Sequence, residues 1–131
     1  MEKAKHNLKA AYYNVQGHFD DWAVSQSYYA MYHSLLAILF NKGFESKNHE
    51  CTISTVEFLI ENKEIELDME DLLFIRTTEQ MTTKDAKSLR EEFQYGTKTD
   101  VNKVLLTELL EKSKAIVEKI EVMLSEMQPQ K

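Results

Sequence analysis

The chain has 131 residues, a formal net charge of −6 at pH 7, and a single cysteine, Cys51. That length suits one domain with a buried core, and the acidic balance provides no basic stripe for non-specific nucleic-acid binding. One cysteine excludes an internal disulfide and fits a reducing compartment. The longest apolar run, residues 35–40, is too short to cross a membrane, and the charged N-terminus lacks an apolar signal core. We therefore expect a cytoplasmic protein without a membrane segment.

Long helices are expected because the chain has three Gly and one Pro, and the Pro stands at position 129. Apolar residues at helical spacing predict a first helix over residues 3–16, which Gly17 ends. A second helix over residues 20–42 is predicted between Asp20 or Asp21 as its cap and Gly43 as its stop. The turn between these helices is short, so we expect them to be antiparallel neighbours.

The second helix is the one around which the rest of the chain is predicted to pack. Trp22, Tyr29, Leu36 and Phe40 fall near one stripe, and alanines stand beside it at steps of seven. Small residues at that spacing let a neighbouring helix approach closely. Since apolar residues cover most sides of this helix, we expect it to lie at the centre of the fold.

Three further helices complete the expected fold. Residues 49–62 predict a third helix, followed by a linker over residues 63–67. Residues 69–95 predict a fourth helix capped by Asp68. Its Thr-rich middle, Thr77 to Thr83, has weak helix propensity, so the sequence leaves open whether the helix is continuous, kinked, frayed or broken there. Residues 100–127 predict the last helix, and residues 128–131 a disordered tail. The prediction is one domain over residues 1–127, an all-α, up-and-down antiparallel helical bundle of four long helices and one shorter helix.

A family resemblance rests on three segments: Ser27-Tyr28-Tyr29-Ala30-Met31-Tyr32-His33, then Lys42-Gly43-Phe44-Glu45, then Lys47-Asn48-His49. Together they resemble the HEPN family (higher eukaryotes and prokaryotes nucleotide-binding domain), in particular its small single-domain prokaryotic members. The pattern of helices extends the resemblance over residues 3–125. The resemblance implies binding of a nucleotide or RNA, or of a partner protein, and a homodimer in which the fourth helix lines a cleft near the two-fold axis. It also implies pairing with a minimal nucleotidyltransferase in a toxin–antitoxin or defence system.

Arg90 falls where the family carries its signature. In members that cut RNA, an Arg is followed four to six residues later by a His, but positions 95–97 here are Tyr, Gly and Thr. The chain looks more like the branch that reads Arg, three residues, Asp, Tyr, with Gln94 in place of the Asp. Arg90 could hold a phosphate by paired hydrogen bonds and Tyr95 could stack on a ligand. The alternative is that Arg90 pairs with a nearby carboxylate and Tyr95 caps the core.

Histidines are the remaining candidates. His33 lies one turn from Tyr29 and is interpreted first as a satisfied core histidine and second as an acid–base group or ligand. His49 resembles a recurrent family position and is expected either to hydrogen-bond a helix terminus or to line the cleft. Candidate catalytic residues are therefore Arg90, Tyr95 and His33; candidate ligand-binding residues are Arg90, Gln94, Tyr95, Tyr29 and His49. No metal is expected, since the Glu-x-x-His pairs of di-iron bundles do not occur, and no cofactor is expected.

Three hypotheses for function follow from these patterns. The favoured one is a non-catalytic HEPN module that binds a nucleotide, RNA or a partner protein. The second is a metal-independent ribonuclease toxin in which Arg90 works with an atypical companion; the missing His weighs against it. The third is a structural or assembly subunit.

Overall fold

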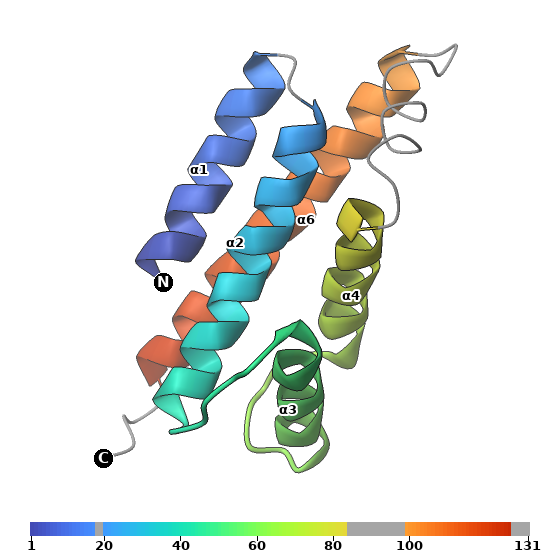
Figure 1. The fold of residues 1–131 in the computed structure, drawn as a ribbon. Helices are drawn as coiled ribbons and strands as arrows, with labels where there is room; N and C mark the ends of the chain where they lie inside the picture. Colours follow the sequence, from blue (N-terminus) through green and yellow to red (C-terminus); the bar gives the residue numbers. More distant parts are fainter. Residues whose placement is uncertain (18–19, 84–98, 127–131) are drawn as a thin grey trace.

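The computed structural model describes residues 1–17, 20–83 and 99–126, and within these ranges it contains five α-helices and no strand (Figure 1). The side chains of residues 20–21, 80–83 and 99–105 lie outside this description. The helices are α1 (Glu2–Gln16), α2 (Asp20–Asn41), α3 (His49–Glu61), α4 (Met69–Thr83) and α6 (Thr99–Glu126). The all-α prediction is confirmed, with four longer helices and the shorter α3.

The helix α2 holds the bundle together, as predicted, because it packs against each of the other four described helices. Figure 1 shows α1 antiparallel to α2 on one side, α3 and α4 on the other side, and α6 behind. No described helix covers the remaining side of α2, which faces the viewer in Figure 1.

Local chemistry explains where α2 ends and α3 begins. Gly43 has φ +80°, the left-handed region that favours glycine, and the N–H of Phe44 returns to the Leu39 carbonyl at 2.9 Å. Asn48 then takes extended backbone angles, and its Oδ1 accepts a hydrogen bond from the Cys51 N–H at 2.7 Å. The two caps fix the loop between α2 and α3, so that His49, the first residue of α3, faces α2.

The core consists of two clusters of buried apolar side chains. The larger one joins α2, α3, α4 and the second half of α6, and it includes Leu35, Ile38, Leu59, Ile75 and Ile120. The smaller one lies where α1 and α2 meet the first half of α6, and Ala11, Ala23 and Val24 pack there against leucines of α6. Ala23 and Ala30 are fully buried, as expected for small residues at a helix–helix contact.

The aromatic stripe on α2 lies largely outside the core. Trp22 and Phe40 are 63% and 86% exposed, and Leu36 is only half-buried. The helix is apolar on nearly all sides, but the described helices cover only part of its circumference. Apolarity all round therefore indicated correctly that α2 is central, and it did not indicate which side remains uncovered.

The two predicted features in the second half of the chain have different outcomes. The predicted linker over residues 63–67 connects α3 to α4 and also contributes to the core, because Ile65 and Leu67 are buried in the larger cluster. The fourth helix is continuous through Thr77 to Thr83; the rest of the range predicted for it, residues 84–95, lies outside the described residues. None of the helices that the structure describes is long and apolar enough to cross a membrane.

Candidate functional site

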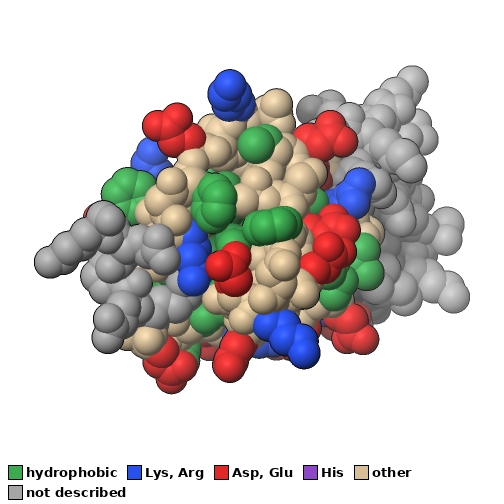
Figure 2. Space-filling model, turned by 90° about the horizontal axis from the view of Figure 1, so that it is seen from below, with side chains coloured by type: hydrophobic (Ala, Val, Ile, Leu, Met, Phe, Trp, Pro, Cys, Tyr) green, Lys and Arg blue, Asp and Glu red, His purple; other side chains and the backbone are tan. Residues whose placement is uncertain are grey.

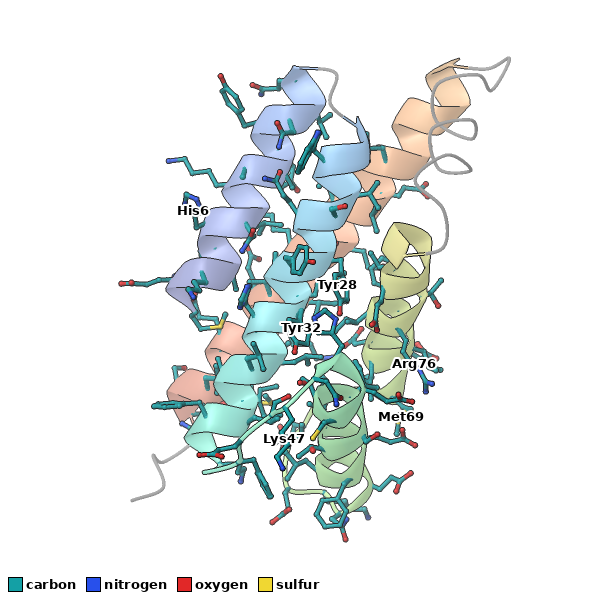
Figure 3. All side chains as sticks on the ribbon, in the orientation of Figure 1. His6, Tyr28, Tyr32, Lys47, Met69 and Arg76 are labelled. Atoms are coloured by element: carbon teal, nitrogen blue, oxygen red, sulfur yellow. The ribbon has the colours of Figure 1, made fainter. Side chains whose placement is uncertain are left out.

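Five ring side chains gather where α2 meets the start of α3. We call them the tyrosine–histidine cluster: Tyr28, Tyr29, Tyr32, His33 and His49. Four come from one stretch of α2, and His49 is brought to them by the capped start of α3. In Figure 3, Tyr28 and Tyr32 extend from the part of α2 that lies beside α3 and α4.

A hydrogen bond between Tyr28 and His49 links the two helices. The Tyr28 ring is 1% exposed, and its Oη lies 2.7 Å from His49 Nδ1. Burial, followed by the nearby Glu79 carboxylate, raises the pKa of Tyr28 above its ordinary value of 10.0. The phenol therefore keeps its proton at neutral pH. It donates a hydrogen bond to Nδ1 in the tautomer whose ring hydrogen stands on Nε2, and accepts one in the other tautomer.

Glu79 of α4 adds a carboxylate to this pair. Its Oε1 lies 3.4 Å from His49 Nδ1, and the side chains of His49 and Glu79 are 40% and 25% exposed. A protonated His49 can therefore form an ion pair with Glu79, whereas a neutral His49 hydrogen-bonds with Tyr28. Three helices meet at this one imidazole nitrogen.

Tyr32 fixes the other side of His49. Its ring centroid lies 4.1 Å from that of His49, and its hydroxyl lies 3.2 Å from Thr52 Oγ1. Thr52 donates to the Asn48 carbonyl at 3.1 Å and also contacts Ser46 Oγ. The orientation of the imidazole is thus set by a buried hydrogen-bonded ring below it, which is how a functional side chain is held in one geometry.

The outward side of the cluster is open. Tyr29 is 42% exposed, and its ring meets that of His49 at 86° with the centroids 6.4 Å apart. His33 is half-buried, with its ring 6.4 Å from that of Tyr29. Burial, then the positive charge of Lys3, lowers the pKa of His33 from its ordinary 6.5. The cluster thus presents accessible ring faces, and His33 at its side is favoured in the neutral form.

The residues predicted from sequence divide into two groups. Tyr29, His33 and His49 come together in the tyrosine–histidine cluster. His33 is not enclosed in the core, as its first interpretation required. His49 both stands at a helix terminus and contributes to the open side of the cluster. Arg90, Gln94 and Tyr95 lie outside the described residues, as does the whole signature segment, residues 90–96.

Sequence reasoning did not list Tyr28, Tyr32 or Glu79 as site residues. Tyr28 and Tyr32 are four apart on one helix face, and buried hydroxyls there require partners, so their pattern carried a usable signal. Glu79 stands in the Thr-rich part of α4 and carried none, because only packing of α4 beside α3 brings it to His49.

The described side chains were also searched for groups that could bind a metal ion. Among residues 1–83 and 99–126 where side chains are described, no three His, Cys, Asp or Glu side chains gather in a way that could hold a metal ion. The cluster instead offers a hydrogen-bonded imidazole, a carboxylate and exposed ring faces.

The sequence was compared with models of known protein families. The model of the HEPN domain matches residues 1–123, nearly the whole chain. The chain belongs to the HEPN family. No curated protein matches it significantly. The tyrosine–histidine cluster lies inside the matched range, on the two helices whose sequence carried the resemblance, so the HEPN fold in this chain positions it.

Proposed function

We propose that this HEPN domain is a non-catalytic binding module, and that its tyrosine–histidine cluster receives the base of a nucleotide or of RNA. The observation that supports this is the open side of the cluster, where Tyr29 and His49 present accessible rings on a buried, hydrogen-bonded support. Unstacked bases bind proteins largely by stacking on Tyr, Phe, Trp or His. A rigid support lowers the entropy lost on binding.

The phosphate of such a ligand needs a cation. In the proposal Arg90 supplies it, with Gln94 and Tyr95 beside it as further ligand-binding residues. The carboxylate of Glu79 beside His49 disfavours a run of phosphates at the cluster itself. Seen from below in Figure 2, the molecule carries acidic and basic side chains interspersed over its described surface, with no single basic patch on that face. A mononucleotide or a short RNA end therefore fits better than a long nucleic-acid strand.

Direct titration of the purified chain with AMP, ATP, GTP and a short single-stranded RNA tests the proposal. The variants are Tyr29→Ala, His49→Gln and Arg90→Ala, with Tyr13→Ala as the matched control because Tyr13 is 75% exposed on α1, outside the cluster. Loss of one stacking ring is expected to weaken binding by about 5- to 100-fold. If Tyr29→Ala and His49→Gln bind every probe as tightly as Tyr13→Ala does, the cluster is not the base site.

One observation favours the second candidate, a ribonuclease. RNA cleavage needs a group to accept the 2′-hydroxyl proton and a cation to stabilise the phosphate charge. His49, oriented by Tyr28 and flanked by Glu79, has the chemistry of such a base, and Arg90 is the cation. Incubation of the purified chain with mixed RNA separates the two functions. The wild type is compared with His49→Ala, Arg90→Ala, His33→Ala and Tyr95→Phe. Cleavage by the wild type that is lost in both His49→Ala and Arg90→Ala would establish the nuclease.

The protein partner belongs to the proposal as well. We propose a minimal nucleotidyltransferase as the protein that this HEPN domain meets in a toxin–antitoxin or defence pair, in the cytoplasm. Co-purification of the two chains from a shared expression vector tests it.

The third hypothesis is a structural or assembly subunit. It is favoured if Arg90→Ala changes neither ligand binding nor RNA cleavage.

A further inference from the structure

The last turns of α2 extend beyond the N-terminal end of α1. The two helices have 22 and 15 residues, so at 1.5 Å per residue α2 is longer by about 10 Å. Figure 1 shows α1 beginning part-way along α2, with the end of α6 behind. A groove with a volume of about 660 Å³ lies at this position, and that volume is within the range of sites for small organic molecules.

Three helices contribute the walls of this groove. The first turn of α1 lies at one side, the second half of α2 forms the floor, and Leu124 of α6 lies at the far side. Apolar side chains line most of it, and among them the Phe40 ring is 86% exposed. A ligand that fits here therefore has an apolar body, and an aromatic ring gains further by contact with the ring of Phe40.

The groove also contains a polar atom that the described chain does not satisfy. Asn41, the last residue of α2, lines the groove, and its Oδ1 is buried without a hydrogen-bond partner among the described residues. Buried polar atoms in proteins are nearly always hydrogen-bonded. An N–H group on a ligand supplies the donor that this oxygen lacks.

The opposite end of the groove is electropositive. Lys3 lines it and makes no ion pair with any side chain that the structure describes. Burial, then the charges of Lys3 and of the N-terminal amino group, lower the pKa of His33 in the same groove, so a positive field acts there although the chain carries −6 overall. Glu2 also lines the groove and limits this field, so one carboxylate fits better than a phosphate dianion.

These features stand apart along α2. Lys3 acts on His33, whereas Asn41 lies eight residues further along the helix, about 12 Å away. The side chain of Lys3 is long enough to cover part of that span. A matching ligand therefore carries its anion and its N–H at opposite ends of a flat apolar body.

We propose that this groove binds a small aromatic carboxylate with a ring N–H at the end opposite to the carboxylate, as in an indole carboxylic acid. The carboxylate lies beside Lys3, the ring lies on Leu36 and Phe40, and the N–H donates to Asn41 Oδ1. The site is separate from the proposed base site, because neither Tyr29 nor His49 lines the groove. His33 alone belongs to both.

Titration of the purified chain with indole-3-acetate, followed by NMR, tests this assignment. The signals of Phe40, Asn41 and Leu124 are expected to shift. Two analogues of the same shape separate the polar contacts. 1-Methylindole-3-acetate lacks the N–H and is expected to bind about 3- to 10-fold more weakly. Indole-3-acetamide lacks the charge and is expected to bind about 2- to 5-fold more weakly. If both analogues bind as tightly as indole-3-acetate, the assignment is overturned.

Matched variants assign each contact to its residue. Asn41→Leu is expected to remove the preference for indole-3-acetate over its methylated analogue, and Lys3→Gln the preference for the acid over the amide. Phe40→Ala is expected to weaken all three probes by about 3- to 10-fold. Phe58→Ala is the control, because Phe58 is 53% exposed on α3 and does not line the groove. Circular dichroism checks that each variant is folded. Preferences that survive in both Asn41→Leu and Lys3→Gln overturn the proposal.

The same experiments separate this site from the proposed base site and from other occupants. Tyr29→Ala is expected to leave indole-3-acetate binding within about 2-fold of wild type, by the usual spread for distant sites, and Phe40→Ala to leave AMP binding unchanged. Probe shifts confined to Tyr29 and His49 overturn the groove and leave the proposed function standing. Groove signals that move with protein concentration in the absence of probe mean that a second copy covers the groove, which also overturns the proposal. So does binding of a longer peptide with a C-terminal tryptophan when no small probe binds.

Discussion

Neighbouring leucines on α2 provide a sharp test of how this bundle is packed. Leu35 is 0% exposed in the larger core cluster, whereas Leu36 is half-buried and lines a surface groove together with Phe40. Leu→Ala removes about three carbon groups, or roughly 2.4 kcal/mol at about 0.8 kcal/mol each, and a rigid cavity raises the cost to about 3–4 kcal/mol at Leu35. At Leu36 only part of that surface is buried and the site opens to solvent, so we expect about 1 kcal/mol.

Urea unfolding followed by circular dichroism measures both costs, and each variant is compared with the wild-type chain at the same protein concentration. The helix propensity gained with Ala is the same at both positions and cancels in the comparison. An equal loss at Leu35 and Leu36 would refute the reasoning, because it would mean that the two side chains are equally buried. A loss at Leu35 below about 0.5 kcal/mol, typical of surface positions, would refute the placement of the core.

Three smaller predictions concern single residues. Lys63 is not a glycine but has φ +57°, in the left-handed region where a side chain is strained. Lys63→Gly is therefore expected to raise the free energy of unfolding by about 0.5–1 kcal/mol in the same urea assay, and a decrease would contradict the presence of backbone strain. Asn48→Ala removes the α3 cap on the Cys51 N–H and is expected to cost about 1 kcal/mol, whereas Asn48→Asp should cost little. The pKa of His33 is lowered by burial, then by Lys3, the N-terminal amino group and His49, so its stabilising effect is present above pH 6.5 and lost as the pH falls through the lowered pKa. His33→Asn should therefore flatten the fall in stability on acidification, and an unchanged pH profile would exclude this role.

The site owes its geometry to caps as much as to packing. Asn48 starts α3 where His49 faces Tyr28, and Gly43 ends α2 early enough for the connecting loop to reach that point. A change at either cap is expected to move His49 relative to α2 before it unfolds the bundle. Binding assays on Asn48→Ala at temperatures where the chain is folded therefore report on positioning of the imidazole.

The sequence alone determined the helical elements of this protein. The scarcity of Gly and Pro, the spacing of apolar residues, and local stops at Gly17 and Gly43 are properties of neighbouring residues. They placed the described helix ends within one residue or so of their predicted positions, apart from the fourth helix, whose end lies beyond the described part of the chain. The three motif segments, residues 27–33, 42–45 and 47–49, also identified the family, since each is a contiguous pattern.

Only the tertiary structure decided which faces of those helices meet. Periodicity showed that α2 is apolar nearly all round, but it could not show that Trp22 and Phe40 lie on the uncovered side, because that depends on where α1, α4 and α6 pack. The meeting of Tyr28, His49 and Glu79 likewise joins residues up to 51 positions apart, on three helices. The physical reason is that hydrogen bonds within a helix are fixed by local sequence, whereas contacts between helices depend on how all their buried surfaces are satisfied at once.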